Sequence, residues 1–130
     1  FVLEFKKNGI RTSIFVDPQE IMVDFAAKTG TDRIELYTEP YATVFETNRN
    51  KAIEPFILAA NRAKLNSIDV NAGHDLNLQN LNFFIKSIPF TSEVSIGHAL
   101  ISDSLYFGLQ NTVQMYLKQL ILWPKMFFLH

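Results

Sequence analysis

The sequence of 130 residues is long enough for one small domain with a single hydrophobic core. Its 48% apolar and 19% charged residues are typical of a globular protein. The lack of cysteine excludes disulfides and thiolate metal sites, and it agrees with a reducing compartment such as the cytoplasm. A net charge of -1, from 12 basic and 13 acidic residues, excludes a chain-wide basic surface for nucleic acid and leaves room only for a local anion site.

The first seven residues show neither a secretion signal nor the start of a membrane span. They lack a basic head, an apolar run and a small-residue cleavage site, and no apolar run in the chain approaches the roughly 20 residues that cross a bilayer. They also lack an initiator methionine and look helical. We therefore expect the chain to begin within a domain and to have no membrane partner.

Four short apolar or β-branched runs alternate along the chain with four helical patterns. The runs predict strands at residues 12–16, 33–37, 67–71 and 93–96. The patterns predict helices at residues 18–28, 55–65, 76–87 and 105–121.

The helical patterns differ in how clearly they begin and end. Gly30 follows the first pattern as a C-cap, and Pro55 suits the first turn of the second, where its missing N–H costs little. The third pattern is the weakest. The last is the clearest, because one apolar stripe runs along it, formed by Leu105, Leu109, Val113, Leu117 and Leu120.

Strands that alternate with helices predict an α/β fold with a parallel sheet. Two architectures fit the order: a small open doubly wound sheet, or part of a (β/α)₈ barrel, which needs about 250 residues and eight strand–helix units. Half a barrel would leave two strand edges unpaired and one sheet face uncovered. We therefore expect such a chain to associate with a partner or with copies of itself.

The end of the chain departs from this pattern. We expect one domain over residues 1–122, and a divergent apolar tail over residues 123–130 in which Pro124 stops the last helix. The tail either packs on the core or a neighbouring subunit, or forms a poorly ordered or altered end.

Two Gly-His pairs follow the third and fourth predicted strands. They are Gly73-His74 and Gly97-His98, and in parallel α/β folds function gathers at the carboxyl ends of the strands. Glycine lets the backbone approach a ligand, and histidine titrates near neutral pH. A single histidine after a strand is more often a cap or a packed side chain, but the repeated arrangement favours a functional site. Metal binding by His74 and His98 is only weakly indicated, because no carboxylate cluster accompanies them.

Glu35 lies within the second predicted strand, between Ile34 and Leu36. Because strand side chains alternate between faces, Glu35 and Tyr37 point away from the helices if Ile34 and Leu36 pack on them. Glu35 then lies inside the barrel, where a carboxylate must be paired or hydrogen-bonded. The alternative is a structural ion pair or a solvated edge residue.

Several segments, in order, resemble the pyridoxine 5′-phosphate synthase family of vitamin B6 biosynthesis. They are residues 12–18 (TSIFVDP), 32–38 (DRIELYT), 41–42 (YA), 70–77 (VNAGHDLN), 96–101 (IGHALI) and 105–109 (LYFGL). The resemblance runs from about Phe1 to Ile121 and matches the fifth to eighth strand units of that barrel. It implies that the chain is the C-terminal half of a TIM barrel.

The resemblance also implies an activity. The family's enzymes are transferases that condense 1-deoxy-D-xylulose 5-phosphate with 3-amino-2-oxopropyl phosphate to pyridoxine 5′-phosphate, phosphate and water, without a metal or organic cofactor, and they assemble as homo-oligomers. By motif position, His74 would be a general acid and Glu35 would stabilise cationic or proton-shuttling intermediates. Gly97 and His98 would hold one substrate phosphate, and Asp75 falls where the family has a glycine that contacts the amino-ketone phosphate.

The chain departs from the family pattern in three ways. Asp75 puts a carboxylate beside a phosphate site, Tyr37-Thr38-Glu39-Pro40 replaces a His-Thr-Gly segment, and the first four strand units are absent. Two other functions therefore stay open: a non-catalytic remnant that self-associates, and an unrelated small phosphate-binding α/β module.

Overall fold

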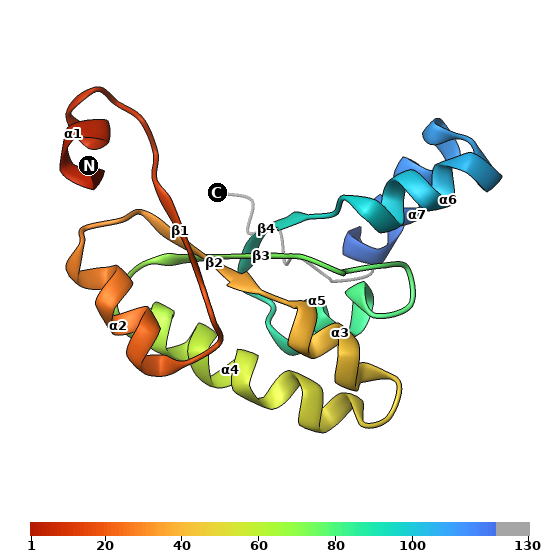
Figure 1. Cartoon of the computed structure of the whole chain (residues 1–130), viewed down its shortest axis with the longest axis horizontal. Helices are drawn as coiled ribbons and strands as arrows, with labels where there is room; N and C mark the ends of the chain where they lie inside the picture. The colour runs from red at the N-terminus through yellow and green to blue at the C-terminus, as the bar shows by residue number, and fades with distance from the viewer. Residues whose placement is uncertain (122–130) are drawn as a thin grey trace, which may run out of the picture.

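A computed structural model describes residues 1–121 and shows a four-stranded parallel sheet (Figure 1). Its strands are β1 (Ser13–Val16), β2 (Arg33–Tyr37), β3 (Asp69–Gly73) and β4 (Thr91–Ser95), in the spatial order β1-β2-β3-β4. All three strand pairs are parallel, as the alternating pattern predicts. β1 and β4 are the two edges of the sheet. The predicted tail at residues 123–130 lies outside the described residues.

Helices follow the strands and cover one face of the sheet. Figure 1 shows α2, α4 and α5 together on one side of the strands. The helices are α1 (Val2–Lys7), α2 (Glu20–Lys28), α3 (Glu39–Phe45), α4 (Arg49–Leu65), α5 (Leu81–Ser87), α6 (His98–Phe107) and α7 (Leu109–Ile121). The α/β class and the alternation expected of half a barrel are therefore confirmed. None of the helices in residues 1–121 is both long and apolar enough to cross a membrane.

The prediction that Pro55 lies in a first turn was wrong. α4 begins at Arg49, six residues earlier, because the Asn48 side chain caps the helix by accepting a hydrogen bond from the Lys51 N–H at 3.0 Å. Pro55 lies inside the helix, where it removes one internal hydrogen bond. Burial of the face that carries Ile53 and Phe56 offsets this cost.

The predicted helix at residues 76–87 begins only at Leu81. Asn77 Oδ1 accepts hydrogen bonds from the backbone N–H groups of Gln79 and Asn80, at 2.9 and 3.1 Å, and so holds a turn where a helix was expected. α3 was not predicted at all. Its residues follow β2 directly, and Pro40 stands in its first turn.

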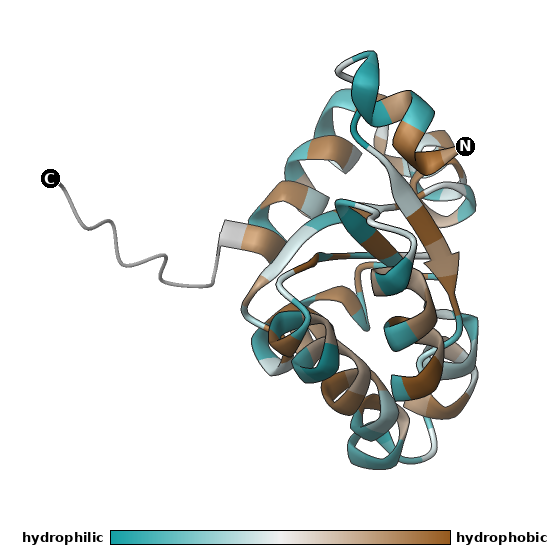
Figure 2. Ribbon diagram, turned by 90° about the vertical axis from the view of Figure 1, so that its left-hand side faces the viewer, coloured by the Kyte–Doolittle hydropathy of each residue, from teal (hydrophilic) through white to brown (hydrophobic). Residues whose placement is uncertain are grey.

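The single helix predicted at residues 105–121 is two helices. Gly108, with a φ of 76°, separates α6 from α7, a backbone conformation that favours glycine. Much of the apolar stripe faces outward: Leu105 is 82% exposed and Leu109 60% exposed, whereas Leu120 packs against the core. In Figure 2, apolar segments alternate with polar ones along α7, the helix that leads into the grey trace. Among residues 109–120 of α7, the buried side chains are Thr112 and Tyr116.

The core lies between the sheet and its helices. The strand residues that face the helices are buried, among them Ile34, Leu36, Val70 and Ala72. Beneath them the rings of Tyr41, Phe56 and Phe84 meet edge to face, with centroids 5.1 to 5.9 Å apart. This packing fixes the covered face of the sheet and leaves the opposite face to carry polar groups.

A bidentate ion pair joins α2 to α4, and it predicts that the stability of the fold decreases at acidic pH. Arg62 donates hydrogen bonds to both Asp24 carboxylate oxygens at 2.7 Å, and Asn66 adds a third at 2.8 Å. These bonds lower the pKa of Asp24 from 3.8 to about 2. Because the folded-state pKa is the lower one, the pair stabilises the fold above about pH 4 and this stabilisation is lost as pH falls toward 2.

We expect the urea midpoint, followed by circular dichroism, to fall between pH 4 and pH 2 less steeply in Asp24→Asn than in the wild type. Glu54→Gln, at an exposed position of α4, is the matched control and should keep the wild-type slope. Equal slopes for all three proteins would contradict a role for Asp24.

Candidate active site

The two Gly-His pairs lie at the same end of the sheet. In the strand register Tyr37 is opposite Gly73 and Gly73 is opposite Ser95, so the three strands end at one level. His74 follows Gly73 directly, and His98 follows Ser95 by three residues. Both imidazoles are exposed. The structure thus brings the two loops to the same end of the sheet, as expected because each loop follows the carboxyl end of one of two adjacent parallel strands.

Glu35 points into the uncovered face of the sheet, as the alternation predicts. Its neighbours Ile34 and Leu36 are fully buried against the helices, whereas Glu35 is only partly buried. The carboxylate lies over the next strand, because a Cβ added at Gly73 would overlap Glu35 Oε1. Glu35 therefore reaches the residue that directly precedes His74.

The loop after β3 has an unusual backbone. His74 and Asp75 have φ values of 96° and 55°, in the left-handed region that costs energy for residues other than glycine. Two side chains behind the loop hold it there. The Thr38 hydroxyl donates to the His74 carbonyl, and Asn80 Nδ2 donates to the Asp75 carbonyl at 3.1 Å.

These two supporting residues were missed by the sequence analysis. Thr38 and Asn80 are buried, and the hydroxyl of buried Tyr41 donates to the Asn80 carbonyl at 2.7 Å. The loop geometry is therefore anchored through Asn80 in the aromatic core. Polar residues of this kind carry no spacing signal, because their role depends on a fold that brings positions 38 and 80 to the same loop.

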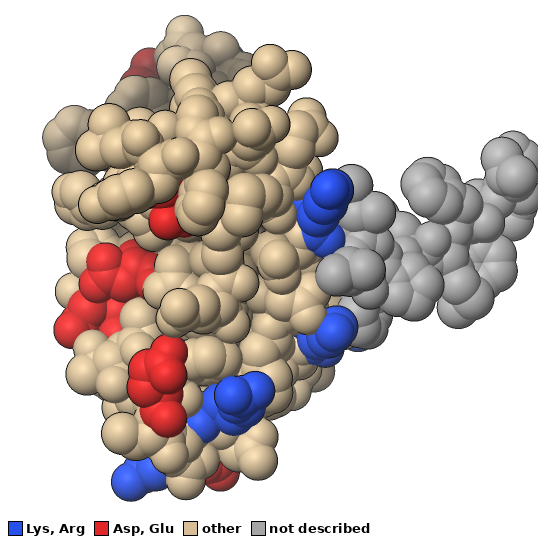
Figure 3. Space-filling model, turned by 90° about the vertical axis from the view of Figure 1, so that its right-hand side faces the viewer, with Lys and Arg blue, Asp and Glu red and all other residues tan. Residues whose placement is uncertain are grey.

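The side chains around His74 are aromatic and acidic. The Tyr37 and His74 rings meet edge to face with centroids 5.0 Å apart, and His74 Nδ1 lies 3.2 Å from Asp75 Oδ2. Desolvation raises the pKa of Tyr37, and the nearby carboxylates of Glu39, Asp75 and Asp17 raise it further. Figure 3 views the molecule from the side on which α3 and α6 lie in Figure 1, and acidic groups occupy its centre and left while basic groups lie toward its right and lower margins.

The loop after β4 leads into the start of α6. Gly97 is the N-cap residue and makes no side-chain capping hydrogen bond, and its carbonyl accepts the first helical bond from Ile101 at 3.2 Å. The N–H groups of the first turn therefore have no partner within the helix. Together with the helix dipole, such N–H groups attract anions, including phosphate.

The amino end of the same sheet face carries a separate charged network. Arg33 Nη1 lies 2.7 Å from Glu93 Oε1, Arg11 pairs with the same carboxylate at 3.0 Å, and the Asn71 amide donates to Glu93 at 3.2 Å. Asp69 pairs with Arg33 at 3.5 Å, so two carboxylates balance the two guanidinium groups. The charged groups at the amino end are therefore paired with one another, whereas the two histidines lie at the carboxyl end of the sheet.

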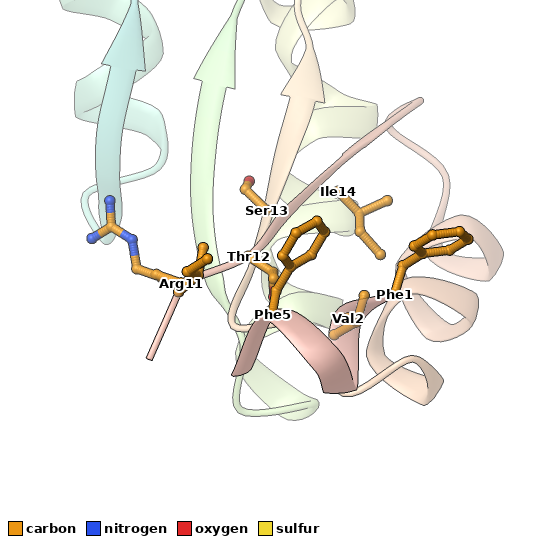
Figure 4. A pocket seen from close by; sticks show the side chains of 8 residues that line it. Phe1, Val2, Phe5, Arg11, Thr12, Ser13 and Ile14 are labelled. Carbon is orange, nitrogen blue, oxygen red and sulfur yellow. The ribbon is translucent and has the colours of Figure 1, made fainter. Parts of the chain in front are cut away.

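A pocket of about 290 Å³ lies away from this site, between α1 and β1 (Figure 4). The rings of Phe1 and Phe5 and the side chain of Ile14 line it, and neither a carboxylate nor an imidazole is among its lining residues. It marks the uncovered β1 edge and does not form part of the candidate site. Within residues 1–121, no three His, Asp or Glu side chains gather in a group able to hold a metal ion.

Replacing Gly73 by alanine should disturb the site from within. The added Cβ would overlap Glu35 Oε1 and lie 3.0 Å from Ser95 Cβ, so Glu35 must move and the β3–β4 contact must widen. We expect Gly73→Ala to lower the free energy of unfolding by about 1–3 kcal/mol, measured by urea denaturation. Gly97→Ala is the control, because a Cβ there meets no heavy atom within 4 Å. A loss of equal size in both variants would argue against the close approach of Glu35 to Gly73.

Comparison with known proteins places this arrangement in a family. The profile of the family described as "Pyridoxal phosphate biosynthesis protein PdxJ" matches residues 1–121. The chain belongs to the PdxJ family. The family assignment that the motifs indicated is therefore confirmed.

The relatives carry the name pyridoxine 5′-phosphate synthase. That of Cytophaga hutchinsonii is 60% identical over 119 residues, which are 92% of this chain and 50% of the relative. That of Parabacteroides distasonis is 62% identical over 112 residues, 86% of this chain and 47% of the relative. The chain thus spans about half the length of the curated relatives it matches, in keeping with half of a barrel.

Proposed function

We propose that this chain supplies the carboxyl-terminal half of a pyridoxine 5′-phosphate synthase barrel. The reaction would condense 1-deoxy-D-xylulose 5-phosphate with 3-amino-2-oxopropyl phosphate, releasing phosphate and water. The observation that carries the proposal is the meeting of Glu35 and the His74 loop at the edge where α6 also begins. The absence of cysteine supports a cytoplasmic setting for this enzyme.

His74 is the proposed general acid. Elimination of a phosphate requires a proton on the leaving oxygen, and an exposed imidazole at the mouth of the site can deliver it near neutral pH. Glu35, directed across the sheet at Gly73, is placed to stabilise the cationic imine intermediates of the condensation. Neither role requires a metal or an organic cofactor.

Gly97 and His98 are the proposed phosphate-binding residues. Their backbone lies at the start of α6, where no side chain of Gly97 competes for the free N–H groups. Asp75 stands at the place of a phosphate-contacting glycine, and its carboxylate lies against the His74 ring. We therefore assign phosphate binding chiefly to the first turn of α6, and less to the loop after β3.

The uncovered edges β1 and β4 support a homo-oligomer or another assembly that completes the barrel. Leu105 and Leu109 belong to α6 and α7, the two helices that follow β4 in the sequence. Their exposed apolar side chains would be covered in such an assembly.

The test is a chimera in which the amino-terminal four strand units of the Cytophaga hutchinsonii relative precede residues 1–121 of this chain. We expect it to form pyridoxine 5′-phosphate from the two substrates, detected by the absorbance of the product. The intact relative is the positive control. A folded chimera without turnover would contradict the proposal and favour a non-catalytic remnant.

A further inference from the structure

Asp75 is the clearest departure of this site from a phosphate-binding loop, and its side chain has a specific neighbour. Asp75 Oδ2 lies 3.2 Å from His74 Nδ1, within ion-pair distance of that ring nitrogen. Of the two imidazole nitrogens, Nδ1 is the one that meets a carboxylate. Accepting the proposed role of His74, we propose that Asp75 is a positioning residue that keeps a proton on Nδ1 of the His74 ring. The protonated ring then gives its Nε2 proton to the leaving oxygen and is left as the neutral tautomer with its proton on Nδ1.

The backbone explains why consecutive side chains meet. In a strand, neighbouring side chains point to opposite faces. Here both residues have positive φ values, 96° at His74 and 55° at Asp75, and their side chains come together instead. The pair therefore depends on the left-handed turn that begins where β3 ends.

Buried groups maintain this turn. The Thr38 hydroxyl donates to the carbonyl of His74, and Asn80 donates to the carbonyl of Asp75 at 3.1 Å. Both supporting side chains are almost completely buried, Thr38 at 0% and Asn80 at 2% exposed. Each of the two strained residues thus has its own anchor, although His74 and Asp75 are themselves exposed.

The ring of His74 is also restricted on another side. Tyr37 meets it edge to face at a centroid distance of 5.0 Å with an interplanar angle of 72°. An imidazole held by an aromatic neighbour and by a carboxylate at Nδ1 has one nitrogen left for proton exchange. A carboxylate that accepts the Nδ1 proton fixes both ring orientation and tautomer, which is how an acidic partner assists a catalytic histidine.

The same contact accounts for a carboxylate beside a proposed phosphate site. A free Asp75 carboxylate would repel an anionic substrate. Directed at the His74 ring, its charge is engaged by the residue it positions. The two possible roles of Asp75 predict opposite effects of Asp75→Gly. If Asp75 positions His74, the substitution lowers kcat. If Asp75 only repels the substrate, the substitution lowers KM.

The tautomer is measured on the chain itself, with nitrogen-15 in its histidines and no substrate present. His74→Asn and His98→Asn assign the ring signals by deletion. In the wild type we expect the neutral His74 ring to carry its proton mainly on Nδ1. In Asp75→Gly the Nδ1 signal should move toward the unprotonated range, while the His98 signals stay unchanged. Glycine suits the φ of 55° at this position, and Asp75→Asn is a second variant that keeps the side-chain volume.

Steady-state kinetics of the same variants in the chimera show whether Asp75 positions His74 or only repels the substrate. We expect Asp75→Gly to lower kcat by about tenfold, with a smaller effect in Asp75→Asn, whose amide oxygen can still accept the Nδ1 proton. A wild-type ring protonated mainly on Nε2, or a tautomer unchanged in Asp75→Gly together with a lowered KM, would overturn the proposal. A wild-type chimera without turnover would contradict the proposed function alone, since the tautomer still decides the role of Asp75.

Discussion

Replacing His74 by asparagine should lower kcat of the chimera by about 10²–10⁴-fold, the usual contribution of a general acid. Asparagine is the suitable replacement, because it tolerates the left-handed backbone at this position, where φ is 96°. The loop held by Thr38 and Asn80 should therefore survive, and the loss should reflect the missing imidazole. Initial rates of pyridoxine 5′-phosphate formation at saturating substrate measure it.

The twin residue His98 provides the matched control. It also follows a glycine at the same edge of the sheet and is exposed, but its proposed contribution comes from the backbone at the start of α6. Because asparagine keeps that backbone N–H, His98→Asn should lower kcat far less than His74→Asn does. Equal losses of kcat in the two variants would contradict the assignment of the acid to His74.

The strands of this fold could be predicted because their sequence signals are local. Each of the four apolar runs coincides with a strand to within two residues, and the alternation around Glu35 correctly placed it on the face opposite Ile34 and Leu36. The helices were harder, because caps decide where they begin and end. Asn48 caps α4, which begins at Arg49, six residues before Pro55, and Gly108 divides a pattern that looked continuous.

The candidate site could be predicted only as a set of positions. The two Gly-His pairs could be predicted to lie at the same end of the sheet, because the carboxyl ends of adjacent parallel strands share one end. The role of Thr38 could not be predicted, since its hydroxyl holds a carbonyl 36 positions away in the chain. Asn80 lies only 5 positions from the Asp75 carbonyl that it holds, but its link to the core comes from Tyr41, 39 positions away. The meeting of His74 and Asp75 likewise depends on a backbone turn that their residue types alone do not indicate.

Replacing Phe84 by alanine should cost about 3–5 kcal/mol of the free energy of unfolding, a large part of the total stability of a small domain. Phe84 is fully buried, and its ring meets those of Tyr41 and Phe56 with centroids 5.1 and 5.7 Å away. The cavity would weaken the hold of α5 on this cluster. Urea denaturation followed by circular dichroism measures the loss.

Phe25→Ala makes the same chemical change at a side chain that is 53% exposed on α2, and we expect it to cost less than about 1 kcal/mol. The comparison also bears on the site. Tyr41 packs on Phe84 and donates through its hydroxyl to the Asn80 carbonyl, and the Asn80 side chain holds the Asp75 carbonyl. Phe84→Ala should therefore speed amide hydrogen exchange in the loop after β3, while Phe25→Ala should leave it unchanged. Equal urea midpoints for the two variants would contradict the role of the aromatic cluster in the fold, and equal exchange rates in the loop would contradict its role in holding the loop.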